Sequence, residues 1–257
     1  MKQYCFIHCF GKGRVPEKGK WKNNVSGGIN RLYYIIGGEG GYIRSGEKSR
    51  FKKGYMYFLP SYNSIPTWSS YETPESVLDH LYVGVEFLPP IITDQVIEIH
   101  PKDDPIIEAA LDVWMKIAEK HRGIKGIDED SLEYLKSTVA YIINKIIARN
   151  DIKTLTDKTI LSALEEIHRN ISKPISVDMI AQNANMSYDG FIKKFKSNLR
   201  TTPYQYIKEL KIRTALTLLD EGATLEEAAL RCGYSEASAL LHAFSTSSFV
   251  NKVIKRV

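Results

Sequence analysis

The sequence lacks the features that mark membrane and secreted proteins. No run approaches the roughly 18 consecutive apolar residues that a membrane-crossing helix needs. The first eight residues are interrupted by polar side chains, so this segment cannot form the apolar centre of a signal peptide. We therefore expect a protein that stays in the cytoplasm and has no membrane partner.

Cysteine and histidine are also scarce. The chain has three cysteines, Cys5, Cys9 and Cys232, an odd number that cannot form a disulfide framework. A cysteine zinc site needs four ligands, and no second pair of cysteines is present to join Cys5 and Cys9. The first hundred residues contain only His8, His80 and, at their edge, His100, without a His-x-His pair. A cupin-type metal enzyme needs two or three converging histidines and a carboxylate. We predict no catalytic residues, no metal and no cofactor, and such an enzyme is our least favoured interpretation.

The overall composition is that of an ordinary folded protein. The chain has 257 residues, of which 43% are hydrophobic and 25% are charged, and this length favours two domains. The net charge of +5 comes from 35 basic and 30 acidic residues. That balance permits nucleic-acid binding without requiring it.

Residues 1–102 have the pattern of an all-β domain. Apolar and aromatic runs occur at 32–36, 55–59 and 81–87. Glycine-rich and proline-rich turn segments separate these runs, as in a sandwich or barrel. Pro89, Pro90 and Pro101 close the region, because proline is excluded from central strands.

Residues 103–149 change to helical spacing. A first pattern contains Ile106, Ala110, Val113 and Ile117, and a second has the steps of a heptad seam. The seam consists of Leu132, Leu135, Val139, Ile142 and Ile146. Two interpretations remain open: the seam packs on the β-domain, or it pairs with its copy in a homodimer. The short polar segment 150–157 is the expected linker.

Residues 158–257 contain an internal repeat and most of the basic excess, with 14 basic and 10 acidic residues. Segments 176–187 and 224–235 match at an offset of 48. Ser176 and Thr224 are suited to cap a helix, and Asn185 and Gly233 tolerate the positive φ of a tight turn. Ser187 and Ser235 are expected to cap the helix that follows each turn. Each segment therefore predicts a helix-turn-helix unit.

A single long helix is predicted between the two units, at 203–219. Pro203 fits its first position, and apolar residues recur along it at helical spacing. Two such units on a fixed spacer can enter successive major grooves if they lie about 34 Å apart.

These residues resemble the AraC/XylS family of bacterial transcription regulators over about residues 158–250. The matching positions are Ile180-Ala181, Met186-Ser187, Phe191 to Lys196, Thr202 to Ile207, Arg213, Ala215, Leu218-Leu219, Ala228-Ala229, Cys232 to Ser235 and Phe244. The resemblance implies an all-α domain of seven helices with two helix-turn-helix motifs. Residues 32–41 and 51–60 also resemble that family's cupin-like effector barrel.

The resemblance places DNA contacts on the second helix of the first unit. It implies base contacts at Asp189, Ile192 and Lys193, whose side chains suit base edges. The neighbouring Lys194, Lys196 and Arg200 are expected at phosphates, with Ser187 and Tyr188 beside them. In the second unit the corresponding positions include Ser238, Leu241 and His242, and basic donors are missing. The family's closing Gly-x-x-Pro tail is absent as well, so we expect this unit to contact DNA poorly or to depend on DNA shape.

The leading function is a sequence-specific DNA-binding regulator that is switched by a small molecule, sugar-like or aromatic, in the N-terminal domain. Aromatic side chains offer stacking faces and hydroxyls for such a ligand; the candidates are Tyr33, Tyr42, Tyr57, Trp68, Tyr71 and Tyr82. The alternative is a ligand-independent regulator that is controlled by dimerisation or by a protein partner. Double-stranded DNA is the expected partner in both cases, and RNA polymerase is a further candidate.

Overall fold

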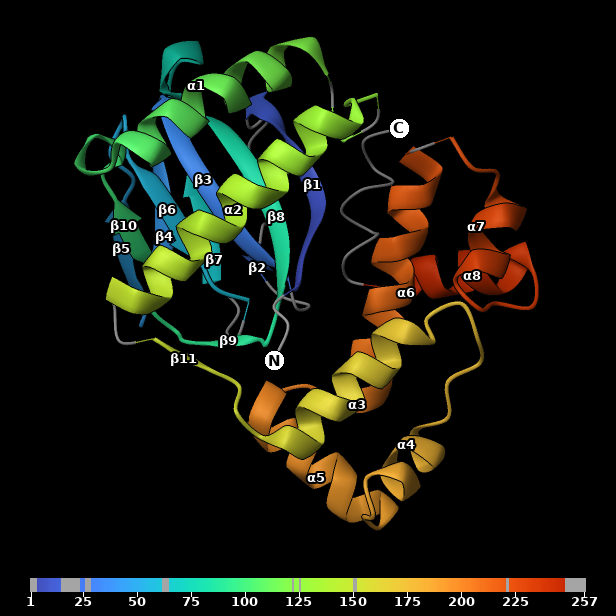
Figure 1. Ribbon diagram of the computed structural model, residues 1–257. Helices are drawn as coiled ribbons and strands as arrows, with labels where there is room; N and C mark the ends of the chain where they lie inside the picture. The colour runs from blue at the N-terminus through green and yellow to red at the C-terminus, as the bar shows by residue number, and fades with distance from the viewer. Residues whose placement is uncertain are drawn as a thin grey trace. The chain divides into compact units, whose positions relative to one another are not determined.

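The computed structural model describes residues 4–14, 24–25, 29–61, 65–121, 123–124, 126–149, 152–220 and 222–247. The chain divides into two compact units, Met1–Thr154 and Leu155–Val257. The division falls inside the segment that the sequence suggests as a linker. The first unit is rich in sheet and the second is helical, which confirms the predicted fold class (Figure 1).

The N-terminal unit is built from two antiparallel sheets. The five-stranded sheet has the order β1 (Tyr4–Arg14), β8 (Asp79–Leu88), β3 (Asn30–Gly37), β6 (Met56–Leu59) and β10 (Ile97–Ile99). The four-stranded sheet has the order β2 (Asn24–Val25), β7 (Ile65–Ser69), β4 (Gly40–Arg44) and β5 (Glu47–Arg50). A short pair joins β9 (Ile91–Ile92) to β11 (Lys153–Thr154), and 3-10 turns occupy η1 (Pro74–Ser76) and η2 (Pro101–Asp103).

Strand β8 contributes side chains to two apolar layers, one on each face of the five-stranded sheet, because successive side chains on a strand point to opposite faces. Leu81, Val83 and Val85 belong to the layer between the five-stranded sheet and the helices. The alternate position Tyr82 packs against a second cluster, which contains buried residues of β3, β6 and β7. This second cluster lies between the two sheets, and we call it the inner layer.

Helices α1 (Pro105–Lys120) and α2 (Glu129–Arg149) cover one face of the five-stranded sheet (Figure 1). The buried carboxylate of Asp104 caps α1, accepting from the backbone amides of Ile106 and Ile107. The same carboxylate pairs with Lys145 and accepts from the Tyr141 hydroxyl at 3.0 Å, both on α2. One buried acid therefore holds the two helices together.

The heptad seam on α2 packs within the chain. Leu135, Val139, Ile142 and Ile146 are at most 3% exposed and belong to the layer between helices and sheet. Leu132 is half-buried. Of the two interpretations left open by the sequence, packing on the β-domain is the one observed. These side chains are not available to a second copy of the chain, so the assignment of the seam as a dimer interface is corrected.

The C-terminal unit has six helices within residues 155–220 and 222–247. They are α3 (Lys158–Arg169), α4 (Val177–Asn183), α5 (Tyr188–Leu199), α6 (Pro203–Asp220), α7 (Leu225–Arg231) and α8 (Ala237–Ser245). The resemblance implies seven helices, but the segment after Ser247, with the altered family tail, lies outside the described residues. Pairs α4–α5 and α7–α8 are the two predicted helix-turn-helix units.

Local chemistry explains both turns. Asn185 and Gly233 have φ values of 53° and 67°, as predicted, and the hydroxyls of Ser176 and Thr224 cap α4 and α7. The expectation that Ser235 caps the last helix is wrong. Helix α8 begins one residue later than α5 does in its unit, so Glu236 is the N-cap and makes no side-chain capping bond.

Two searches of the described residues gave no candidate of the kind sought. None of the helices described is long and apolar enough to span a bilayer. Within the same part of the chain, no three His, Cys, Asp or Glu side chains gather in a group that would hold a metal ion.

Candidate nucleic-acid interface

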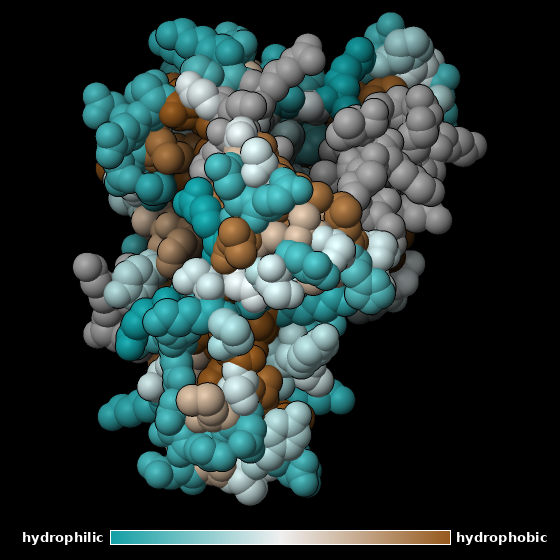
Figure 2. Space-filling view, turned by 90° about the vertical axis from the view of Figure 1, so that its right-hand side faces the viewer, coloured by the Kyte–Doolittle hydropathy of each residue, from teal (hydrophilic) through white to brown (hydrophobic). Residues whose placement is uncertain are grey.

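Helix α5 presents one buried and one exposed face. Phe191 and Phe195 are fully buried, and the Phe195 ring packs on Tyr206 of α6 at 5.8 Å between centroids. The side chains on the opposite face are open to solvent, with Ile192 half-buried among them; they are Tyr188, Asp189, Lys193, Lys196 and Arg200. The surface over α4 and α5, at the bottom of the view in Figure 2, is mostly hydrophilic with a few hydrophobic residues. The exposed face of α5 thus combines the hydrogen-bond donors of its lysines, the acceptor carboxylate of Asp189 and the apolar side chain of Ile192.

Two predicted contact residues of the first unit already have partners within the protein. The Ser187 hydroxyl accepts from the amide of Gly190 at 3.2 Å and caps α5. The Lys194 ammonium lies 2.9 Å from a carboxylate oxygen of Asp157, the N-cap of α3. Partial burial raises the pKa of Asp157, but bonds from Lys194 and from the amide of Ile160 outweigh it and lower the pKa. A DNA phosphate at Lys194 would have to compete with this carboxylate.

Helix α8 presents fewer exposed basic side chains than α5. Leu240 and Phe244 are buried as predicted, and Leu241 and His242 are exposed. The exposed Ser238 hydroxyl donates to the Glu236 carboxylate at 2.6 Å. The apolar contact available at Leu241 suits a thymine methyl group better than a phosphate.

The two units differ in charge although they share a scaffold. Segment 176–200 contains four Lys or Arg and two Asp or Glu residues, whereas segment 224–247 contains one Arg and three Glu residues. Because the DNA backbone is uniformly negative, affinity depends mainly on the neutralising cations. The first unit therefore has the stronger electrostatic attraction to DNA.

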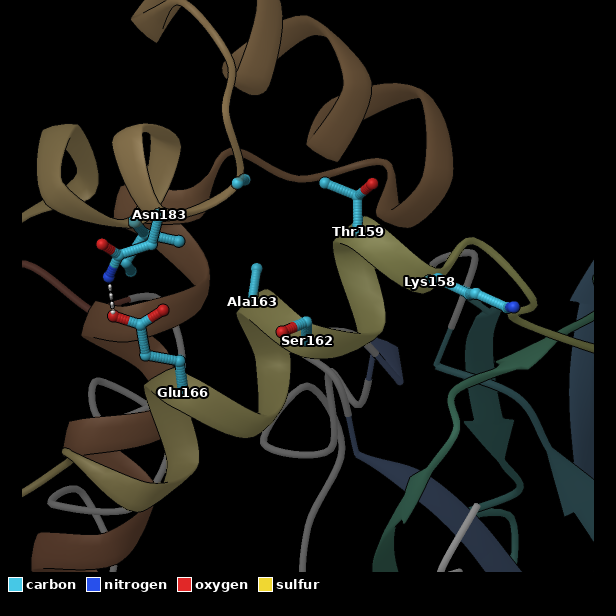
Figure 3. Close-up of a pocket in the computed structure, with 8 residues that line it drawn as sticks. Lys158, Thr159, Ser162, Ala163, Glu166 and Asn183 are labelled. Carbon is cyan, nitrogen blue, oxygen red and sulfur yellow. Dashed lines mark hydrogen bonds between the residues drawn. The ribbon is translucent and has the colours of Figure 1, made fainter.

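A hollow of about 280 Å³ lies between α3 and α4 (Figure 3). The Asn183 amide donates to the Glu166 carboxylate at 2.9 Å and closes one end. Lys158 extends away from the other labelled side chains in that view. The hollow marks the joint that holds the first unit on α3, and none of its lining residues is a predicted DNA contact.

Five of the six effector candidates surround the inner layer of the N-terminal unit. Tyr33 and Tyr57 are 1% exposed within it, and three others pack against it half-buried; these are Tyr42, Tyr71 and Tyr82. The Tyr57 hydroxyl donates to Glu98 at 2.9 Å and accepts from the amide of Lys52 at 2.9 Å. Burial raises the pKa of Tyr57, so its hydroxyl stays protonated and occupied by protein partners.

Trp68 lies apart from the other five candidates. It pairs with Gly41 across β4 and β7, whereas the next pair contains Tyr42, which packs on the inner layer. Adjacent positions on a strand face opposite ways, so Trp68 faces the outside of the four-stranded sheet. There Lys48 lies over its ring at 5.4 Å.

Sequence reasoning missed the polar groups near the inner layer. The His80 ring packs against Tyr33 and Tyr82, with centroids 4.8 and 5.8 Å away. His8 on β1 bonds to the buried carboxylate of Glu86 on β8 at 3.1 Å. The alternation of His80, Tyr82 and Glu86 with Leu81, Val83, Val85 and Phe87 was readable in the sequence and could have identified this face.

Comparisons with known proteins agree with this architecture. Residues 180–247 match the family model described as a helix-turn-helix domain. The chain is 21% identical over 210 residues to the lactose operon transcription activator of Staphylococcus xylosus, covering 80% of this chain and 75% of that protein. It is 32% identical over 84 residues to the HTH-type transcriptional regulator AlkR of Acinetobacter baylyi, covering 32% of this chain and 28% of AlkR.

Solved structures of ToxT from Vibrio cholerae have a similar fold. An apo ToxT variant matches with a TM-score of 0.58 at 11% identity, over 97% of this chain and 95% of that chain. ToxT bound to an unsaturated fatty acid matches with a TM-score of 0.54 at 12% identity, over 95% and 91% of the two chains. These structures show the similarity of fold, whereas the helix-turn-helix match of residues 180–247 and the similarity to the lactose operon activator show that the protein is a DNA-binding transcription regulator. Its C-terminal domain is a helix-turn-helix domain of the AraC type, which confirms the resemblance found in the sequence.

Proposed function

We propose that this regulator binds its DNA site chiefly through α5. Asp189, Ile192 and Lys193 contact base edges in the major groove, and Lys196 and Arg200 contact phosphates. The observation that supports this most strongly is the charge difference between the two units. The exposed face of α5 contains the cations that the exposed face of α8 lacks.

The second unit contributes contacts that depend little on salt. Leu241 and His242 are exposed on α8, and the apolar side chain fits a thymine methyl group. Contacts of this kind release few counterions, so they add affinity without adding much salt dependence. The second unit then orients the protein on its site while the first supplies most of the attraction.

Selection from random duplex DNA tests this assignment. The full-length protein is incubated with a random library, and bound duplexes are sequenced over several rounds. We expect a strong motif for the first unit, next to a weaker one about one helical turn away. Enrichment of two equally strong half-sites, or of no motif, would contradict the proposal.

We further propose that a small molecule, sugar-like, aromatic or acyl, binds in the inner layer. The tyrosines and His80 around that layer provide ring faces and hydroxyls for such a ligand. The similar proteins include a lactose operon activator and ToxT bound to an unsaturated fatty acid, which suggests the compound classes to try first.

Thermal unfolding with a metabolite panel tests the effector. A compound that binds only the folded state raises the melting temperature, and above Kd the rise increases with the logarithm of its concentration. Tyr82→Phe, at the inner layer, should reduce this shift, whereas Trp68→Phe, on the outer face, should leave it unchanged. If no compound of these classes shifts the melting temperature, the ligand-independent regulator is favoured instead.

The same proposal includes a cytoplasmic location, where DNA and RNA polymerase are present, and no enzymatic activity. A homodimer stays a prediction. Its interface would use surfaces other than the α2 seam, because the seam side chains are buried within one chain.

A further inference from the structure

Lys211 on α6 is a buried lysine at the meeting point of three segments of the C-terminal unit. The residue is only 8% exposed to solvent. Its ammonium donates to the carbonyl of Lys173 at 3.2 Å and to the carbonyl of Gly233 at 3.1 Å. It also lies 5.3 Å from the centroid of the Tyr234 ring.

One carbonyl lies just before the first helix-turn-helix unit, and the other lies within the second unit. Lys173 lies in the loop that leads from α3 to Ser176, the N-cap of α4 in the first unit. Gly233 forms the turn between α7 and α8 in the second unit. A single side chain of the connecting helix therefore links the entrance of one unit to the turn of the other.

The backbone at Gly233 approaches Lys173 and Lys211 closely. A Cβ atom at Gly233 would lie 2.7 Å from the Lys173 carbonyl oxygen and 2.9 Å from the Lys211 ammonium. Burial lowers the pKa of Lys211, which reflects the cost of removing the ammonium from water. Such a cost is offset only where the donors find partners, here two carbonyls and a ring face.

We infer that Lys211 is a positioning residue that fixes the orientation of the two helix-turn-helix units relative to each other, and so sets the spacing of the DNA contacts. This inference rests on the proposed function, in which both units contact one DNA site. When the ammonium is removed, the two units sample several orientations. Only the fraction with the correct spacing then binds a full site, and the apparent affinity falls by that fraction.

The test compares the full-length wild type with Lys211→Met on three kinds of duplex. These are the full selected site, a site with the second half scrambled, and full sites with one or two base pairs inserted between the halves. We expect Lys211→Met to bind the full site about tenfold more weakly, because the competent fraction falls. Binding to the scrambled site stays at the wild-type level, and the preference for the native spacing is lost.

Two further readouts separate positioning from simple loss of charge. The slope of log affinity against log salt should not change, since Lys211 contacts no phosphate. Lys208→Met is the control, because it removes a charge one turn away on α6. Among the described residues, the Lys208 ammonium donates a hydrogen bond to the Thr246 hydroxyl. This variant should keep the spacing preference. Lys211→Arg keeps a cation and hydrogen-bond donors at this position and should keep most of the spacing preference.

Three results would overturn the inference. The first is a folded Lys211→Met protein with the wild-type spacing preference. The second is an equal loss of affinity for full and scrambled sites in both Lys211→Met and the milder variant Lys211→Gln, which keeps a polar side chain. The third is a wild type that binds full and scrambled sites equally, which contradicts the proposed function as well.

Discussion

The difference in charge between the two helix-turn-helix units predicts an asymmetric salt dependence of DNA binding. The perturbation is a pair of double substitutions that replace basic side chains by the uncharged, polar glutamine. One is Lys196→Gln with Arg200→Gln on the first unit, and the other is Arg231→Gln with His242→Gln on the second. All four side chains are exposed, so the substitutions leave both cores intact.

The magnitude follows from counting phosphate contacts. Each phosphate that a protein cation neutralises contributes about 0.9 to the slope of log affinity against log salt concentration. Removing Lys196 and Arg200 should therefore reduce the slope by about 1.8. Removing Arg231 and His242 should reduce it by less than about 0.5, because Glu226, Glu227 and Glu236 already oppose phosphate contacts there.

The assay is fluorescence anisotropy with a labelled duplex of the selected site, at salt concentrations between about 50 and 200 mM, where affinity for DNA falls steeply with salt. Circular dichroism confirms that both variants are folded. Basic residues Lys252, Lys255 and Arg256 lie outside the described part of the chain and are present in both variants, so their contribution cancels. Equal flattening in the two variants would refute the assignment of the first unit as the main phosphate-binding unit.

Three further predictions concern the scaffold. Leu135→Lys with Ile142→Lys should unfold the N-terminal domain, seen as loss of cooperative melting, since each places a charge in a dry core; a folded monomer would contradict the packing described. Thr224→Ala should lower the free energy of unfolding by about 1 kcal/mol in denaturant titrations, because it removes the capping box of α7; no change would contradict the cap. The lowered pKa of Asp157 stabilises the fold above about pH 4 and this contribution is lost as pH falls through the lowered value. Lys194→Ala should make the acid limb of stability shallower, and an unchanged limb would show that the pair contributes nothing.

The parts of the fold that depend on local chemistry were predictable from the sequence. Ser176, Thr224, Asn185 and Gly233 each satisfy a requirement of the residues next to them, and all four occupy the predicted capping or turn positions. The prediction that Ser235 caps α8 was wrong for an equally local reason. The second unit has one extra residue before its last helix, which moves the N-cap to Glu236.

The remaining differences depend on contacts between residues distant in sequence. A heptad seam has the same pattern whether it faces a sheet or a second helix, so burial of Val139 by β-strands could not be distinguished from dimerisation. The pairing of Lys194 with Asp157, and the placement of Trp68 on the outer face, require strand register and helix packing that a single sequence does not specify. The role of Lys211 likewise appears only when two loops are brought to one helix.

The most direct test of base recognition by α5 compares the binding specificity of two single variants. Lys193→Ala and Lys196→Ala are each subjected to selection from random DNA, and the resulting base preferences are compared with those of the wild type. We predict that Lys193→Ala costs about 1 to 3 kcal/mol at the selected site and relaxes the preference at one position. Lys196→Ala should weaken binding to all sequences nearly equally, because a phosphate contact has no sequence information. Identical base preferences in the two variants would contradict direct base contact by Lys193.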